Sequence, residues 1–224
     1  MGQAIGQSLP MAIGIALSPI PIIAVVLMLT TPRARSNGPA FVGGWLLGLA
    51  IVGVIVLAII GPSSSSTGQP ATWVSVVKIV LGVLLFLVAL QQFRRRPRHG
   101  DQTPMPRWMG TIDRFKPVTS VGAGAVLAGA NPKNLLLAVG GAATIAQTGI
   151  AGGKQALAYI VFALVATIGV GAPVVIYFAM GERSAGLLAE VKEWMGRYNA
   201  VIMSVLCLVI GVKLIGDAIS GLAS

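Results

Sequence analysis

Cysteine and histidine are scarce in this sequence, and their scarcity excludes several classes of protein. The 224 residues include one cysteine, Cys207, so no disulfide can form within the chain. A membrane thiol–disulfide carrier needs at least two thiols and is therefore excluded. The single histidine, His99, leaves no His/Cys cluster for zinc, copper or haem. We expect neither a metal site nor another cofactor.

Charge is also scarce. Only 10% of the residues are charged, whereas a soluble domain carries about 25%. Hydrophobic residues make up 55% of the chain, and the mean hydropathy is +0.87. These values predict an integral membrane protein. Because the apolar segments hold no paired carboxylates and no Ser/His/acid set, we do not expect an enzyme.

Six apolar segments have the roughly 20 residues that a membrane crossing requires. They cover residues 4–30, 41–60, 73–93, 118–147, 156–180 and 200–219. The sequence therefore predicts an all-α membrane protein with six transmembrane helices. The first segment lacks the positively charged start of a cleaved signal peptide and is too long for one, so it is expected to be the first span.

Lysine and arginine are concentrated in alternate linkers. Linkers 31–39, 94–117 and 181–199 are basic, whereas the other two contain only Lys154. The positive-inside rule places the basic linkers in the cytoplasm and both termini outside the cell membrane. The net charge of +10 is then mainly a topology signal, with anionic lipids as secondary partners. Nucleic acid is not an expected partner.

Within the last basic linker, residues 184–198 have the pattern of a short amphipathic helix at the inner interface. Its apolar face would consist of Leu187, Leu188, Val191, Trp194 and Met195. The alternative is a solvated connector.

Two proline motifs divide the chain into halves. Pro19 and Pro132 are 113 residues apart, and this offset overlays the first span on the fourth and the second on the fifth. The third overlays the sixth once the amphipathic insertion is allowed for. Residues 1–93 and 118–224 would then be two three-helix repeats joined by a basic linker, 94–117. Because each repeat has an odd number of spans, the two are inverted.

Proline removes a backbone donor and clashes with the preceding turn, so SPIP at 18–21 and NPKN at 131–134 predict broken first and fourth helices. Paired breaks in corresponding spans point to a substrate site, although single kinks are common in membrane helices. The expected substrate-binding residues at the breaks are Ser18, Pro19, Pro21, Asn131, Pro132, Lys133 and Asn134.

Lys133 strengthens this interpretation. A charge in mid-span costs about 2.5–3.5 kcal/mol, and segment 118–147 contains no acidic residue to pair with it. We infer that Lys133 faces a polar cavity and binds an anion or a carbonyl. A half-helix starting at Asn134 would add free N–H groups that favour an anion.

Three further residues are candidates for the same site. Lys78 lies inside the third span, with snorkelling to the surface as the alternative. Lys213 and Asp217 are spaced for an i, i+4 pair in the sixth span, which would neutralise itself. Several glycines permit close helix packing, and they are Gly38, Gly43, Gly44, Gly48, Gly122, Gly124 and Gly129.

Three segments, SPIPIIAVVLML, RARSNGPAFVGGWLLG and ANPKNLLLAVGG, resemble the peptidoglycolipid-addressing proteins of mycobacteria and other actinobacteria. This family includes the glycopeptidolipid- and sulfolipid-addressing proteins and belongs to the lysine-exporter superfamily. The likeness spans nearly the whole chain. Both break motifs match by position, and Arg33, Arg35, Asn37 and Gly38 match the first cytoplasmic loop. The resemblance implies an inner-membrane protein that helps to move lipids toward the cell surface.

Three functions follow from these observations. The first is a transporter of lipids or lipid-linked anions, since the spans carry lysines and the breaks lack the carboxylates of a cation carrier. The second is an exporter of amino acids or similar small solutes. The third is a scaffold that does not transport. Besides substrate and membrane lipids, the candidate partners are lipid-synthesis or export machinery and a second copy of the chain.

Overall fold

The chain folds into a bundle of helices. The computed structural model describes residues 1–64, 72–94, 111–112 and 114–223, and these contain no β-strand. The long elements are α1 (Gly2–Ala16), α2 (Pro19–Leu29), α3 (Ala34–Ser64), α4 (Thr72–Arg94), α5 (Pro117–Gly129), α6 (Pro132–Gln147), α7 (Gly152–Met180) and α8 (Ser184–Ala223). A short 3₁₀ turn, Gly181–Arg183, joins α7 to α8.

Among the described residues, four helices are long and apolar enough to cross a membrane, namely α3, α4, α7 and α8. The pair α1 and α2 makes a fifth candidate, bent by 52° where one span was expected. Segment 118–147 forms α5 and α6, and α5 is a shorter apolar helix. The fold is therefore an all-helical, multi-pass membrane protein. The six-span inverted repeat stays a prediction.

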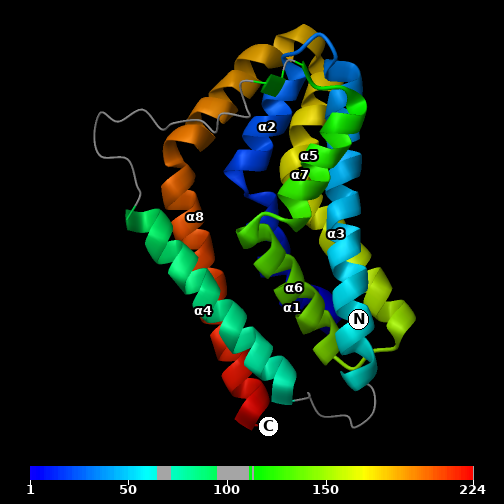
Figure 1. Ribbon diagram of the computed structural model, residues 1–224, viewed down its shortest axis with the longest axis vertical. Helices are drawn as coiled ribbons and strands as arrows, with labels where there is room; N and C mark the ends of the chain where they lie inside the picture. The colour runs from blue at the N-terminus through cyan, green and yellow to red at the C-terminus, as the bar shows by residue number, and fades with distance from the viewer. Residues whose placement is uncertain (65–71, 95–110, 113, 224) are drawn as a thin grey trace.

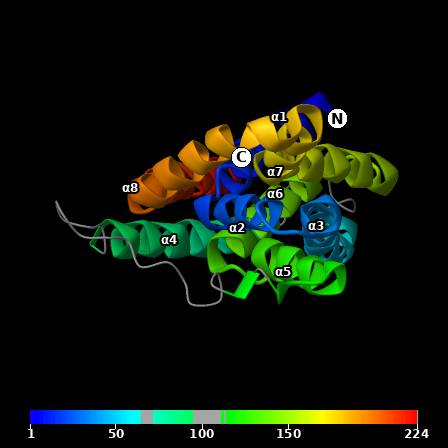
Figure 2. The same ribbon diagram turned by 90° about the horizontal axis from the view of Figure 1, so that it is seen from above.

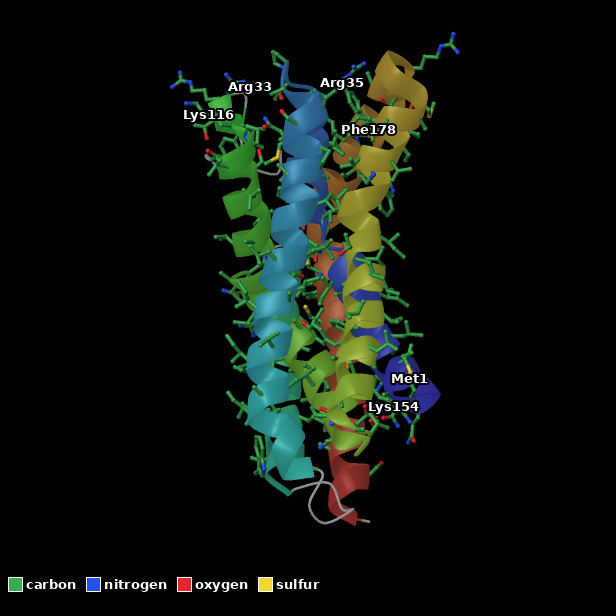
Figure 3. All side chains as sticks on the ribbon, turned by 90° about the vertical axis from the view of Figure 1, so that its right-hand side faces the viewer. Met1, Arg33, Arg35, Lys116, Lys154 and Phe178 are labelled. Carbon is green, nitrogen blue, oxygen red and sulfur yellow. The ribbon has the colours of Figure 1, made fainter. Side chains whose placement is uncertain are left out.

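Described basic residues from two of the basic linkers lie at one end of the bundle. Figure 3 shows Arg33, Arg35 and Lys116 at that end, and Met1 and Lys154 at the opposite end. The chain end after α8 lies at the same end as Met1 (Figure 1). The alternation of charge along the sequence thus corresponds to two chemically different ends of the molecule.

The segment predicted as a separate amphipathic helix, 184–198, instead forms the start of α8, a continuous helix of 40 residues. Its apolar residues do not share one environment. Leu188 and Met195 are buried, whereas Leu187 and Trp194 are 43% and 54% exposed. The reason is that one side of this part of α8 packs into the bundle, which divides the predicted apolar face.

Helix pairing depends on glycine at one interface. Helices α3 and α5 lie side by side (Figure 2), and a Cβ added to Gly44 or Gly124 would collide with the backbone of the partner helix. A Cβ on Gly48 would meet the backbone of Ala125. Small residues let the two backbones touch, as expected for packing inside a bilayer. Gly43 and Gly122, by contrast, face open space.

We predict that Gly124→Ala destabilises the folded protein by about 1–3 kcal/mol, because the new methyl group overlaps the Phe41 carbonyl oxygen. Thermal unfolding of the detergent-purified protein measures the effect. Gly122→Ala on the same helix is the control. Apart from its chain neighbours and the backbone of its own helix, no heavy atom lies within 4 Å of the Cβ that this substitution adds. Alanine favours helix, so the melting temperature of this variant should not fall. Equal losses in both variants would contradict this account of α3–α5 packing.

Candidate functional site at the two helix breaks

The first break separates α1 from α2. It lies at Leu17 and Ser18, and Pro19 is the first residue of α2. The first turn of a helix has N–H groups without helical partners, and proline has no N–H to leave unpaired. Pro19 and Pro21 therefore reduce the cost of starting a helix inside the protein.

The second break separates α5 from α6 in the same way. Pro132 is the first residue of α6, and Asn131 is its N-cap. The Asn131 side chain accepts a hydrogen bond from the Lys133 backbone N–H at 3.2 Å. The helix thus begins two residues earlier than the expected start at Asn134. One of the N–H groups expected to be free for an anion is already bound by the cap.

Each break frees a backbone carbonyl, and a side chain from the second break binds it. The Ser18 N–H bonds to Ile15 O at 3.1 Å rather than to Gly14 O, as it would in a continuous helix. Gly14 O instead accepts a hydrogen bond from Lys133 Nζ at 2.6 Å. In α5, Leu127 O accepts a hydrogen bond from Asn134 Nδ2 at 2.9 Å. Hydrocarbon offers no such donors, so these bonds make the breaks tolerable in a membrane.

The two breaks meet in one hydrogen-bonded cluster, which we call the break cluster: Gly14, Ser18, Lys133 and Asn134. Lys133 Nζ donates to Ser18 Oγ at 2.6 Å, and Ser18 Oγ donates to Asn134 Oδ1 at 2.7 Å. Lys133 is 2% exposed. An ammonium has three N–H donors. With two bonded to the described residues, the group has capacity for one more acceptor.

The structure places the other predicted site residues in a second group, on α4 and α8. Lys213 forms a salt bridge with Asp217 at 2.5 Å. Lys78 is 4% exposed, so it does not snorkel to solvent. It lies close enough to Asp217 and Lys213 for charge interactions with both. Lys78, Lys213 and Asp217 therefore do not join the break cluster, contrary to the expectation of one shared site.

The loop motif has two parts with different surroundings. Arg33 and Arg35 are exposed. Asn37 is buried and donates from Nδ2 to Phe115 O at 3.0 Å. A Cβ on Gly38 would meet Leu29 Cδ2 at 2.8 Å. Asn37 and Gly38 thus fix how α3 packs, whereas the two arginines are available at the surface.

Sequence reasoning missed two members of the site that act through their backbone, Gly14 and Leu127. The proline motif predicts that carbonyls are freed, but it does not say which ones. That choice depends on how the two helices end. The last turn of α1 tightens, since Ser18 N–H bonds to Ile15 O, whereas the last turn of α5 widens, since Asn131 N–H bonds to Val126 O. Sequence reasoning also missed that Cys207 of α8 lies near Lys133.

The fold and this cluster define a class: a multi-pass helical membrane protein with a buried lysine between two interrupted helices. The model of one family, described as Sap, sulfolipid-1-addressing protein, matches residues 9–220. The chain belongs to this family, which agrees with the resemblance seen in the break and loop motifs. No curated protein and no solved structure matches the sequence. The chain is thus a membrane protein linked to lipid export.

We predict that Ser18→Ala lowers the free energy of unfolding by about 1–3 kcal/mol, because it leaves Lys133 Nζ and Asn134 Oδ1 each short of a partner. Ser8→Ala is the matched control, since Ser8 is a buried serine whose hydroxyl, among the described residues, bonds within its own helix to Ile5 O. Its cost should stay below about 1 kcal/mol. Chemical denaturation in detergent compares the two, and equal losses would argue against a stabilising role for the break cluster.

Proposed function

We propose that this chain transports a lipid or a lipid-linked anion across the cell membrane, with Lys133 binding the anionic group. The observation that supports this most directly is the position of the Lys133 ammonium. It is buried and bonds to Gly14 O and Ser18 Oγ, which lie at the opposite break. An anionic group that replaced these two acceptors would remove the hydrogen bonds that join the two breaks. It would therefore affect both interrupted helices.

The proposed motion is alternating access between two inverted three-helix repeats. The helix contacts support this arrangement. Helix α3 packs on α5 as α7 packs on α1, and α4 packs on α6 as α8 packs on α2. If each helix is exchanged for its equivalent in the other half, these pairs of neighbours map onto one another. The equivalents are α1 and α5, α2 and α6, α3 and α7, and α4 and α8. The pair α4 and α8, which occupy equivalent places in the two halves, also pack on each other.

In this mechanism the observed arrangement is the closed one. The carbonyl and hydroxyl partners of Lys133 bind two of its three N–H groups and hold the two breaks together. An incoming sulfate, phosphate or carboxylate is a stronger acceptor, because both partners of the new hydrogen bond carry charge. When the anion takes the ammonium, α1 loses its bond to Lys133, and the two breaks can separate. The mechanism needs no catalytic step, and we propose no enzymatic activity.

The family description names sulfolipid-1, and a sulfate ester has the negative charge that Lys133 can bind. This favours a lipid substrate over the second candidate, an amino acid or similar small solute. Such a zwitterion would also bring an ammonium group close to that of Lys133, and the break cluster contains no carboxylate to bind it. The third candidate is a scaffold for lipid-synthesis or export machinery at the basic end of the bundle.

Reconstitution into liposomes tests the proposal. The probes are fluorescent sulfatide and fluorescent galactosylceramide, which differ by one sulfate group, and radiolabelled amino acids. We expect transbilayer movement of sulfatide above that of galactosylceramide. Lys133→Ala should reduce it by roughly tenfold to a hundredfold, the value of one charge-assisted hydrogen bond. Lys133→Arg should also be impaired, because the site is closely packed around a smaller ammonium.

Lys154→Ala is the control for this experiment, since Lys154 is an exposed lysine at one end of the bundle, and it should transport normally. Unchanged sulfatide movement in both Lys133 variants would remove Lys133 from the mechanism. Movement of amino acids alone would favour the small-solute exporter. Failure of the native protein to move any probe would favour the scaffold.

We also propose that the basic end of the bundle faces the cytoplasm and that both termini are extracytoplasmic. A membrane-impermeant maleimide should therefore label Lys154→Cys on intact cells. Arg35→Cys, at the opposite end (Figure 3), should react only after permeabilisation. The native chain is a suitable background because its one cysteine, Cys207, is buried. The reverse labelling pattern would invert the topology.

A further inference from the structure

A groove of about 740 Å³ lies between α4 and the second break. Its walls include Leu84, Leu87, Gln91 and Arg94 from α4, and Pro132 and Leu135 from α6. Leu84, Leu87 and Leu135 are 41%, 54% and 36% exposed. The walls of the groove are thus open to the surroundings of the bundle, which in a membrane are lipid.

The groove has a polar end and an apolar end. Helices α4 and α6 run in opposite directions (Figure 1). Arg94 is the last residue of α4 and Pro132 the first of α6. Gln91 and Arg94 therefore lie toward the start of α6, at the break. Leu84, two to three turns earlier in α4, lies about 15 Å from Arg94 along the helix, and Leu135 lies one turn into α6.

We propose that this groove binds one membrane lipid with an anionic headgroup. The headgroup would lie at Gln91 and Arg94, and an acyl chain would lie against the leucines. Charge and shape favour this occupant. Arg94 is the one charged residue among the described lining residues, and a headgroup with net negative charge binds such a cation more strongly than a neutral one. A free phosphate or sulfate would leave the leucine walls uncovered. Only an amphiphile with negative charge at one end satisfies both parts of the groove.

The position of the groove gives it a place in transport. Pro132 lines the groove, and the next residue, Lys133, belongs to the break cluster. A headgroup at Arg94 would therefore lie beside the break between α5 and α6. It would reach the Lys133 ammonium through this break. This part of the inference rests on the proposed function. The binding of an anionic lipid in the groove does not, and it can be measured separately.

Photocrosslinking in nanodiscs tests the binding. The probe lipids are equal amounts of phosphatidylglycerol and phosphatidylcholine, and p-benzoylphenylalanine replaces Leu87 in the groove or Leu164 on α7. The two leucines are matched, being 54% and 56% exposed, and Leu164 is outside the groove. Mass spectrometry counts the crosslinked lipids. We expect the ratio of phosphatidylglycerol to phosphatidylcholine to be about fivefold higher at Leu87, the preference that one cationic side chain confers.

Arg94→Gln should reduce the ratio at Leu87 to the value at Leu164, and Arg94→Lys should retain most of it. Crosslinking at Leu164 in the same variants reports that the protein is still folded in the bilayer. Equal ratios at Leu87 and Leu164 in the native background would overturn the proposal. A preference at Leu87 that survives Arg94→Gln would overturn it as well.

The same measurement separates this inference from the proposed function. Lys133→Ala should keep the lipid preference at Leu87, because Lys133 does not line the groove. If the native protein showed the preference but moved no lipid, the transport proposal would fail and the groove would stand. If it moved sulfatide without any preference at Leu87, the groove would fail and transport would stand.

Discussion

The hydrogen bond from Lys133 to the Gly14 carbonyl is the interaction on which the arrangement of the two breaks depends. A backbone carbonyl without a donor and an ammonium without an acceptor are each expensive in hydrocarbon. Here one satisfies the other, and they come from positions 119 residues apart in the chain. Ser18 and Asn134 extend the same network. The freed carbonyl of the first half thus depends on the second half for its donor, and Lys133 depends on the first half for both acceptors.

The prolines explain why the positions of both breaks were predictable from the sequence. Pro19 and Pro132 each begin a helix where a continuous one was impossible. The lysine next to Pro132 also indicated that polar partners must lie close by. The identity of those partners was not predictable, because Gly14 carries no side-chain signal. It contributes a carbonyl only because the end of α1 tightens by one residue.

Two other interpretations from the sequence failed for the same reason. The environment of a residue in a bundle depends on which neighbouring helix packs against it. The apolar positions of 184–198 predicted a helix, but not that the helix would continue through α8 or that the bundle would cover one side of it. Snorkelling of Lys78 to the surface was the alternative interpretation, yet Lys78 is buried and Asp217 of α8 lies close to it. Periodicity describes one helix at a time, whereas these outcomes are set by pairs of helices.

The glycines of α3 and α5 have a mechanical consequence. Where Gly44 and Gly124 bring two backbones into contact, there is no layer of flexible side chains to deform between the helices. Such an interface resists shear, so α3 and α5 should move as one rigid body. Helix α4 packs mainly on α8 and only lightly on α6. A separation of α4 from α6 therefore breaks few contacts, and such a movement would widen the groove between them.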